Sequence, residues 1–205
     1  MGGGSEPHPR VAEPSSQAAL LTRTSKELLG ERPLPNVLRE RPVLYVLGDR
    51  GCGKSTVAQR LAPSGSPAYD AEAFRKALNL AARQRKWAEV LTDSPGLIFD
   101  GVDCLHRRYG VIRLLGELLR MRADAGRRTV LVAGDADTSV ALLYPELPCE
   151  QRATVLLRFP VGGGRRRFVN ERCAARGIDP ARGAGAFALD PWSYAGVERY
   201  LDELS

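Results

Sequence analysis

Short, wholly apolar runs alternate with longer amphipathic segments from residue 42 onward. The runs cover residues 43–47, 97–99, 129–133 and 155–157. A run without polar interruption is typical of a strand buried on both faces of a parallel sheet. The spacing of apolar positions predicts helices over 18–30, 54–61, 71–91, 111–125, 165–176 and 193–204. Alternating strands and helices predict an α/β fold with helices on both faces of a parallel sheet.

A glycine-rich loop joins the first apolar run to the helix predicted after it. Its sequence fits the pattern G-x-x-x-x-G-K-[ST] at every fixed position. Glycines let backbone N–H groups approach phosphate oxygens, and the helix that follows adds positive potential. A bare strand-to-helix turn is the alternative, but the loop lies between the correct elements. We therefore predict that ATP binds through Gly48, Asp49, Arg50, Gly51, Cys52, Gly53, Lys54, Ser55 and Thr56.

The chemistry of this phosphate loop (the P-loop) also requires a metal ion and an acid. Lys54 is expected to reach the β- and γ-phosphates, and the Ser55 hydroxyl to ligate Mg²⁺. Asp100 ends the apolar run 97–99, so we predict that Ser55 and Asp100 are the metal ligands, unless Asp100 only caps its strand. Hydrolysis needs a further group that activates water. Gly101 follows and has no side chain, which leaves Asp103 as the candidate in this turn.

Four further segments carry a family resemblance, namely 68–74, 97–105, 129–135 and 154–178. Together with the P-loop, they make residues 42–178 resemble the DnaA-type branch of the AAA+ ATPases, the bacterial replication initiators and their small regulatory relatives. This resemblance implies a parallel P-loop NTPase sheet with helices on both faces and a short, reduced helical lid. It also places Asp135 near the γ-phosphate, so that the catalytic candidates are Asp100, Asp103 and Asp135.

The chain departs from the family at several functional positions. The second acid of the metal-side strand falls on Gly101, and the lid position of a phosphate-sensing arginine falls on Glu198, with Arg199 beside it. The arginine finger has only Arg152 as a substitute. The initiators continue into a DNA-binding domain, so we expect this chain not to be an initiator itself. The predicted regions are a disordered tail over 1–17, a nucleotide-binding core over 18–160 and the lid over 161–205.

Composition and charge restrict where in the cell the protein is expected, but they do not identify its partner. The net charge is +6, which permits nucleic acid contact without requiring it. Arginines 165–167 could bind phosphate, but a solvated helix face is the simpler interpretation, because no aromatic residues interleave with them. The four cysteines have no zinc-type spacing, and no apolar run approaches the roughly 20 residues of a membrane helix. We expect a cytoplasmic protein without membrane contact.

Three functions fit these features. The first is a regulatory or adaptor protein whose bound ATP controls its interaction with a protein partner, and which is at most a weak ATPase. The second is a small-molecule kinase, in which residues 70–72 would hold the acceptor and arginines 165–167 would close on phosphates. The third is a protein-binding inhibitor or chaperone-like partner with the same fold. A core strand order of 5-1-4-3-2 favours the first function over the second.

Overall fold

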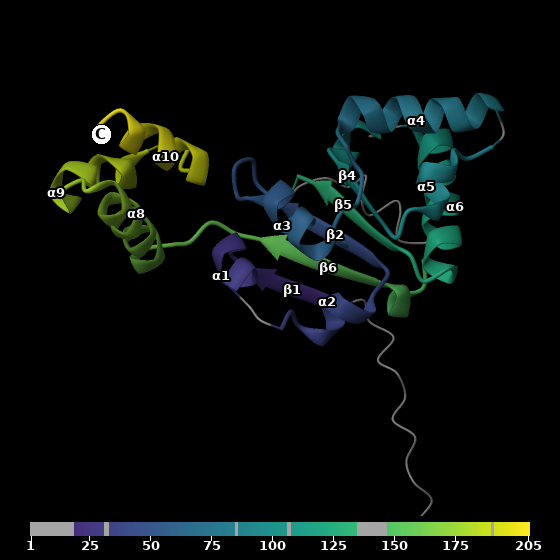
Figure 1. Cartoon of the computed structure of the whole chain (residues 1–205), viewed down its shortest axis with the longest axis horizontal. Coiled ribbons are helices and arrows are strands. Elements are labelled where there is room, and N and C mark those ends of the chain that lie inside the picture. Colours follow the sequence, from purple (N-terminus) through teal and green to yellow (C-terminus); the bar gives the residue numbers. More distant parts are fainter. Residues whose placement is uncertain (1–18, 31–32, 85, 106–107, 135–146, 190) are drawn as a thin grey trace, which may run out of the picture.

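The computed structural model describes residues 19–30, 33–84, 86–105, 108–134, 147–189 and 191–205. Within these ranges, six strands form one parallel sheet in the order β1-β6-β2-β5-β4-β3 (Figure 1). Their bounds are β1 Ala19–Arg23, β2 Val43–Gly48, β3 Ala68–Tyr69, β4 Gly96–Asp100, β5 Arg128–Ala133 and β6 Arg152–Leu157. The predicted α/β class is therefore confirmed, and so are the strands predicted from the four apolar runs.

The position of β5 identifies the topology. Numbered from β2, the strand that leads into the P-loop, the last five strands run in the order 5-1-4-3-2. β5 thus lies between β2 and β4, with Val43 opposite Thr129 and Gly96 opposite Arg128. All carboxyl ends of parallel strands meet at one edge of a sheet, which is where α/β proteins bind their ligands. Here that edge brings together the ends of β2, β4 and β5.

Two helical layers cover the sheet, as predicted. On one face lie α4 Ala71–Gln84, α5 Glu89–Asp93, the short 3₁₀ helix η1 Val102–Leu105 and α6 Tyr109–Asp124. On the other lie α1 Ser25–Gly30, α2 Asn36–Glu40 and α3 Lys54–Leu61. Alternate residues of β2 divide between the two layers, because successive strand side chains point to opposite faces: Val43 and Tyr45 pack under α4 and α6, and Leu44 and Val46 pack under α3.

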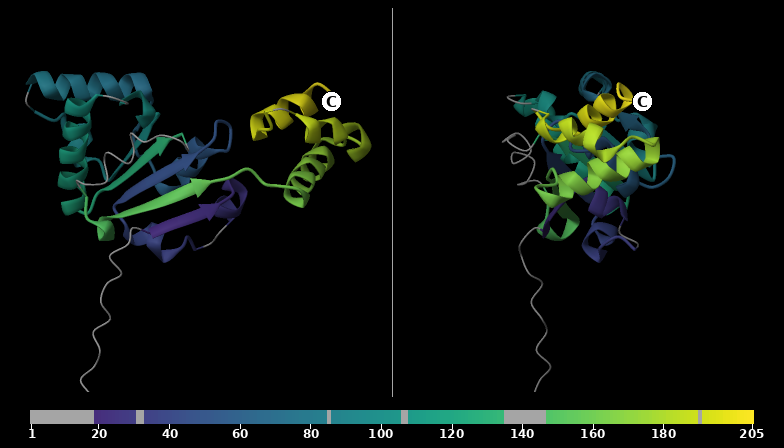
Figure 2. Two further views of the ribbon diagram at one scale, coloured as in Figure 1. Left: turned by 180° about the vertical axis from the view of Figure 1, so that it is seen from behind. Right: turned by 90° about the vertical axis from the view of Figure 1, so that its left-hand side faces the viewer.

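A helical lid follows β6 and has its own small core. It consists of α8 Gly163–Arg176, α9 Pro180–Gly183, the 3₁₀ helix η4 Ala184–Ala188 and α10 Tyr194–Asp202. Gly177 ends α8 in the left-handed conformation, and the Ser193 hydroxyl caps α10 by accepting the Gly196 N–H at 3.0 Å. Both predicted lid helices are confirmed. Figure 2 shows the lid beside the sheet, joined to it by the extended connection after β6.

Two helix predictions were wrong. Residues 18–30 do not form one helix, because Ala19–Arg23 is an edge strand that pairs with β6. α1 starts only at Ser25, where Thr24 and Glu27 form a reciprocal capping box: the Thr24 N–H donates to the Glu27 carboxylate at 2.7 Å, and the Glu27 N–H donates to the Thr24 hydroxyl at 3.2 Å. Residues 71–91 form two helices rather than one, since α4 ends at Gln84 and α5 begins at Glu89.

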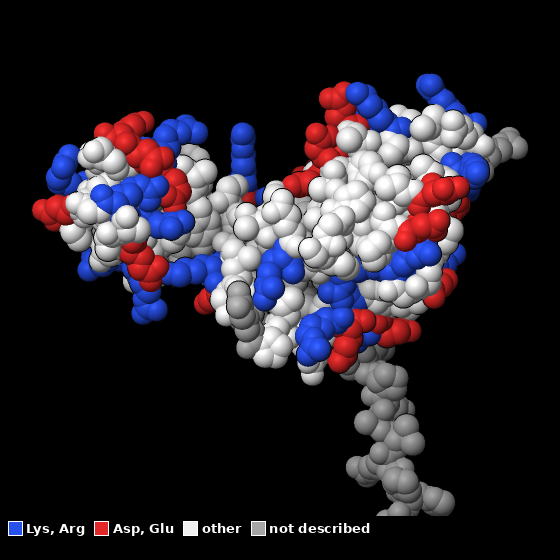
Figure 3. Space-filling view, viewed as in Figure 1, with Lys and Arg blue, Asp and Glu red and all other residues white. Residues whose placement is uncertain are grey.

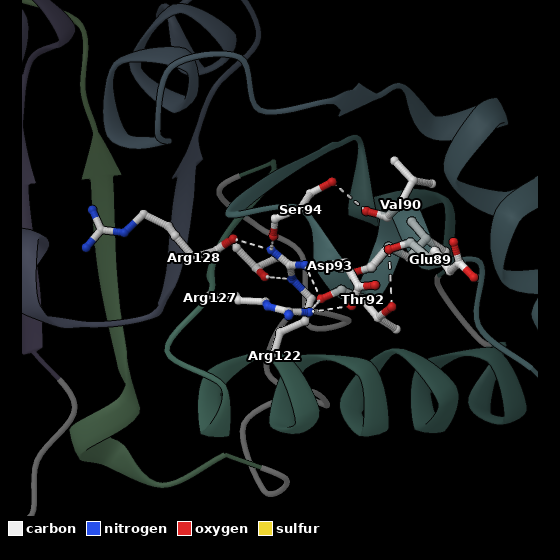
Figure 4. Close-up of polar contacts among 10 residues, drawn as sticks. Glu89, Val90, Thr92, Asp93, Ser94, Arg122, Arg127 and Arg128 are labelled. Carbon is white, nitrogen blue, oxygen red and sulfur yellow. Dashed lines mark hydrogen bonds and ion pairs between the residues drawn. The ribbon is translucent and has the colours of Figure 1, made fainter.

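A buried arginine closes the amino edge of the sheet (Figure 4). The fully buried Arg122 of α6 donates through Nε to the Thr129 hydroxyl at 2.9 Å. Its two Nη atoms donate to the carbonyls of Leu91 at 2.7 Å, Ser94 at 3.0 Å and Arg128 at 2.8 Å. Burial lowers the pKa of the Arg122 guanidinium to about 10, and the neighbouring Arg127 adds to this. The group therefore stays charged at neutral pH and links α5, α6 and β5. No helix in the described ranges is both long and apolar enough to cross a bilayer.

Candidate functional site

The P-loop lies between the core and the lid. It leaves β2 at Gly48 and enters α3 at Lys54. Gly51 and Gly53 have φ angles of +83° and +89°, a region that glycine adopts without strain. A Cβ at Gly51 would lie 2.7 Å from that of Ser193 in the lid, and one at Gly53 would lie 2.9 Å from that of Ser25 in α1. Both glycines are therefore required by conformation and by close approach.

The polar groups of the loop make hydrogen bonds within the loop and to the end of β4. Lys54 Nζ donates to the carbonyls of Gly48 at 2.7 Å and Asp49 at 2.8 Å, which holds the ammonium group over the loop. The Ser55 hydroxyl donates to Asp100 Oδ2 at 2.5 Å. A hydroxyl and a carboxylate are hard oxygen donors of the kind that Mg²⁺ takes alongside phosphate oxygens. These residues therefore fit a magnesium ion, although the described residues contain no cluster of three or more His, Cys, Asp or Glu side chains.

The turn after β4 has no side chain beside Asp100. Gly101 has a φ of +83°, and a Cβ there would lie 2.9 Å from the Cβ of Ala71. Asp103, on η1, accepts the backbone N–H of Gly134 with both carboxylate oxygens, each at 3.0 Å. The third catalytic candidate, Asp135, lies outside the described residues.

A cleft of about 610 Å³ brings most of the predicted residues together. Its walls are Arg50, Gly51, Gly53, Lys54, Ser55, Thr56, Asp100, Asp103, Gly134, Tyr194 and Ala195. Cys52 is fully buried in the core, and that burial raises the pKa of its thiol, so its side chain contributes nothing to the cleft. Gly48 and Asp49 serve the site through their carbonyls, which hold Lys54.

A second cavity, of about 480 Å³, opens between α1 and the lid. It shares Gly53, Thr56, Tyr194 and Ala195 with the cleft, so the two spaces are adjacent. Its other walls are Ser25, Lys26, Leu29, Phe168, Glu171, Arg172 and Glu198. Lys26 of α1 forms an ion pair with Glu171 of α8 across it. Our sequence reasoning missed this cavity, because no local pattern brings residues 25–29 against the lid.

Glu198, which the sequence resemblance aligned with a phosphate-sensing arginine, forms ion pairs within the lid. Glu198 of α10 pairs with Arg172 at 2.6 Å and with Arg176 at 2.5 Å, both from α8. Arg199 is exposed. Arg152 is the first residue of β6 and lies opposite Val43, at the amino edge of the sheet and away from the cleft. Among the described residues of the lid, Tyr194 and Ala195 line the cleft, and Arg172 lines the neighbouring cavity.

Three features define a P-loop fold of the AAA+ type. They are the P-loop between β2 and α3, Asp100 at the end of β4 and the strand order 5-1-4-3-2. Solved structures with this fold include a DNA replication initiation factor, with a TM-score of 0.60 and 13% identity, covering 82% of this chain and 59% of that one. Replication initiator DnaA bound to AMPPCP and single-stranded DNA matches with a TM-score of 0.59 and 11% identity, covering 82% and 58%. Domain III of DnaA from Thermotoga maritima matches with a TM-score of 0.51 and 16% identity, covering 70% and 67%.

These similarities concern the fold. The structural likeness to DnaA that the resemblance implied is confirmed for the fold, together with the all-parallel sheet. This chain spans somewhat more than half the length of the first two initiator structures. The sequence matches no protein-family model and no curated protein.

Proposed function

We propose that this protein is a regulatory or adaptor protein that binds ATP with Mg²⁺ and changes its affinity for a protein partner with the bound nucleotide. One observation carries the proposal: a complete P-loop with a Ser55–Asp100 pair lies directly beside Gly101, a position that admits no side chain. The P-loop and the Ser55–Asp100 pair favour nucleotide binding, and the lack of a side chain at Gly101 opposes ATP hydrolysis. A bound γ-phosphate can order elements that a partner then contacts, without any need for fast hydrolysis.

The two adjacent cavities suit the two ends of a nucleotide. Phosphates belong in the cleft with Lys54, while Ser55 and Asp100 would hold Mg²⁺, whose charge offsets that of the phosphate oxygens. The nucleoside would extend past Tyr194 into the cavity between α1 and the lid. Tyr194 lines both spaces, and its ring packs against Phe168, with ring centroids 4.8 Å apart, and against Trp192 at 5.4 Å. One of the similar initiator structures is described as bound to AMPPCP, which supports a nucleotide ligand.

Weak or absent hydrolysis follows from the groups near Asp100. An efficient ATPase needs a side chain that orients or deprotonates water. Gly101 offers none, and its left-handed conformation and its contact with Ala71 oppose the introduction of one. We therefore expect turnover far below the median enzyme rate of about 10 per second.

The alternatives lose support from two features. The strand order favours the regulator over the kinase, as does Asp70: its carboxylate accepts the Ala73 N–H at 2.8 Å and so caps α4 instead of facing an acceptor.

A nucleic acid partner is not required. On the face in Figure 3, basic side chains lie among acidic ones, and Arg165 packs over the Trp192 ring at 5.0 Å. An inhibitor that has lost nucleotide binding remains as the third function, and the titration below distinguishes it.

Calorimetric titration with Mg·ATP and with Mg·tripolyphosphate tests the proposal. The wild-type protein should bind both, because both carry the phosphate chain. Lys54→Ala should lose at least about 100-fold in affinity for both, since it removes the charged donor that the phosphate oxygens would accept from. Tyr194→Ala should weaken ATP binding about tenfold through lost contact with the nucleoside and leave tripolyphosphate binding unchanged.

Arg60→Ala provides the matched control for loss of positive charge, because Arg60 lies exposed on the same helix as Lys54 and does not line the cleft. A wild-type protein that binds neither ligand would refute the nucleotide site and favour the pure protein-binding function. Turnover at ordinary enzyme rates would refute the regulatory part. A partner captured equally with ATP, with ADP and by Lys54→Ala would show that the nucleotide does not control the interaction.

A further inference from the structure

The connection between β6 and α8 exposes apolar surface. Val161 in this connection is 78% exposed. It lines a third space of about 480 Å³, which we call the connection pocket, and the other apolar walls of that pocket are Phe159, Pro160, Phe168 and Tyr194. The next residues, Gly162 and Gly163, line a further space of about 540 Å³ with Phe187. Apolar surface that gathers in hollows and is rimmed by charge is typical of a binding site.

The three arginines at the start of α8 have different surroundings. Arg165 Nε donates to the Pro160 carbonyl at 3.0 Å, and its guanidinium lies 5.0 Å from the centroid of the Trp192 ring, so this side chain fastens the connection to the lid. Arg166 and Arg167 are exposed, and neither forms a hydrogen bond or ion pair with another described residue. Arg167 lines the connection pocket, and Arg166 lines the space with Phe187. Two cations that the fold does not use therefore lie beside the exposed apolar surface.

The acidic side chains near these arginines are already engaged. α8 has no acidic residue in its first turn. Glu171, one turn further along α8 than Arg167, forms an ion pair with Lys26. Glu27, which also lines the connection pocket, accepts the Thr24 N–H at 2.7 Å. The positive charge of this surface is therefore not compensated locally, and it is complementary to an acidic ligand.

We propose that this surface binds an acidic segment of the protein partner, with an apolar side chain of that segment in the connection pocket beside Val161 and its carboxylates paired with Arg166 and Arg167. This inference rests on the proposed function, because it names the contact that the nucleotide would control. It gives a role to two of the arginines that the sequence alone assigned to a solvated helix face.

A protein segment fits the surface better than a nucleic acid does. Stacking of bases needs aromatic faces that are open to solvent. Phe168 is only 9% exposed, and its ring centroid lies 4.8 Å from that of Tyr194 and 6.1 Å from that of Trp192. The Phe159 ring packs edge-on against Trp192 at 5.6 Å. These rings are engaged in the core of the lid, and the apolar surface beside Val161 has no counterpart in a phosphate backbone.

Tyr194 links this surface to the nucleotide cleft. Its side chain lines the connection pocket, the cavity between α1 and the lid, and the cleft. Its ring packs against Phe168 and Phe159, with centroids 4.8 Å and 6.2 Å apart, and both are walls of the connection pocket. A ligand that displaces Tyr194 on one side therefore disturbs the pocket on the other, so nucleotide and partner should affect each other's binding.

Selection from a phage-displayed library of random linear peptides tests the surface, with the full chain and without nucleotide. The enriched peptides should combine Asp or Glu with Leu, Ile, Val or Phe, and fluorescence anisotropy gives the affinity of one of them. Val161→Ser should weaken its binding about tenfold through lost apolar contact. The double variant Arg166→Gln and Arg167→Gln should also weaken it about tenfold, through lost charge-assisted hydrogen bonds.

Two matched controls remove similar groups elsewhere. Leu80→Ser changes an apolar residue of α4 that is 50% exposed, and Arg199→Gln removes an exposed cation from α10. Neither residue lines the connection pocket or the space with Phe187, so both controls should bind the peptide within about twofold of wild type. Thermal unfolding confirms that all variants are folded.

The inference is overturned if the selection enriches no peptide, if the enriched peptides are not acidic, or if Val161→Ser and the arginine variant bind them as the wild type does. A single-stranded oligothymidylate that binds more tightly than the peptide, and loses this affinity in the arginine variant, would assign the surface to nucleic acid instead. Saturating Mg·ATP should change the peptide affinity at least about fivefold, and no change in a protein that binds ATP would also overturn the inference. A wild type that binds no ATP refutes the proposed function, while the peptide selection still reports whether the surface takes an acidic segment.

Discussion

Replacing Arg122 tests how the amino edge of the sheet is held together. Arg122→Met keeps an apolar stem of similar length but removes every N–H donor. The Thr129 hydroxyl and the carbonyls of Leu91, Ser94 and Arg128 then lose the partner that lies 2.7–3.0 Å from each of them. Arg122→Lys keeps a charge but offers three donors around one point, in place of the planar fork that reaches all four oxygens.

The expected loss of stability follows from those four acceptors. Leaving a buried acceptor unpaired costs about 1–3 kcal/mol, and breaking a buried polar network costs about 3–5 kcal/mol in total, because the neighbours relax. We therefore expect Arg122→Met to lower the free energy of unfolding by about 4 kcal/mol. Arg122→Lys should cost about 2 kcal/mol, since an ammonium group satisfies only part of the set.

Urea unfolding followed by circular dichroism measures both changes at constant m-value. Arg113→Met is the matched control: Arg113 lies on the same helix, is 77% exposed and contacts Glu117 at 3.6 Å, so its loss should change stability by less than about 0.5 kcal/mol. ATP affinity of the folded variants should not change, because Arg122 lies at the edge opposite the cleft. A loss below about 1 kcal/mol in Arg122→Met would refute the reasoning.

Three further predictions concern other parts of the molecule. Gly101→Glu should lower the free energy of unfolding in urea by about 2–3 kcal/mol, because the φ of +83° and the contact with Ala71 both resist a side chain. The variant should produce no ATP turnover. Adding Ala71→Gly should recover part of the lost stability. The hydrogen bond from the Thr24 backbone N–H lowers the pKa of Glu27 in the folded protein. The stability that Glu27 adds should therefore be present above its unfolded pKa of 4.5 and disappear as the pH falls through its lower folded pKa. Glu27→Ala should cost about 1 kcal/mol at pH 7 and remove this dependence from unfolding curves measured at several pH values. Burial raises the pKa of Cys52, so mass spectrometry after iodoacetamide treatment at pH 8 should show slower alkylation there than at the half-buried Cys149.

Features with a local physical cause could be predicted from the sequence. The wholly apolar runs identify β2, β4, β5 and β6, because neither face of a strand covered on both sides contacts water, so both faces carry apolar residues. The P-loop is similarly local, since its glycines, Lys54 and Ser55 lie within eight consecutive residues. The Ser55–Asp100 pair is longer in range, but parallel strands carry their carboxyl ends to a common edge, which made it predictable as well.

Features that depend on distant partners could not be predicted in this way. β1 has only five residues, and Leu20 is 64% exposed at the edge of the sheet, so the segment lacks the pattern of a buried strand. The capping box at Thr24 was a local signal for the true start of α1, and it would have corrected the helix prediction. The cavity between α1 and the lid, and with it the position of Tyr194, depends on how the lid returns over the P-loop.

Nucleotide binding would depend on residues that are mostly close in sequence, whereas hydrolysis would depend on how separate helices and strands pack together. The elements that would hold a nucleotide lie in one continuous loop and one strand end, so they can be complete whatever the rest of the site contains. A water-activating acid at residue 101 would instead require β4 and α4 to fit together differently, because residue 101 has a φ of +83° and a Cβ there would lie 2.9 Å from the Cβ of Ala71 on α4. One substitution cannot meet that requirement without disturbing the packing of α4. This packing beside Asp100 supports the proposed function, in which the protein responds to a nucleotide instead of consuming it.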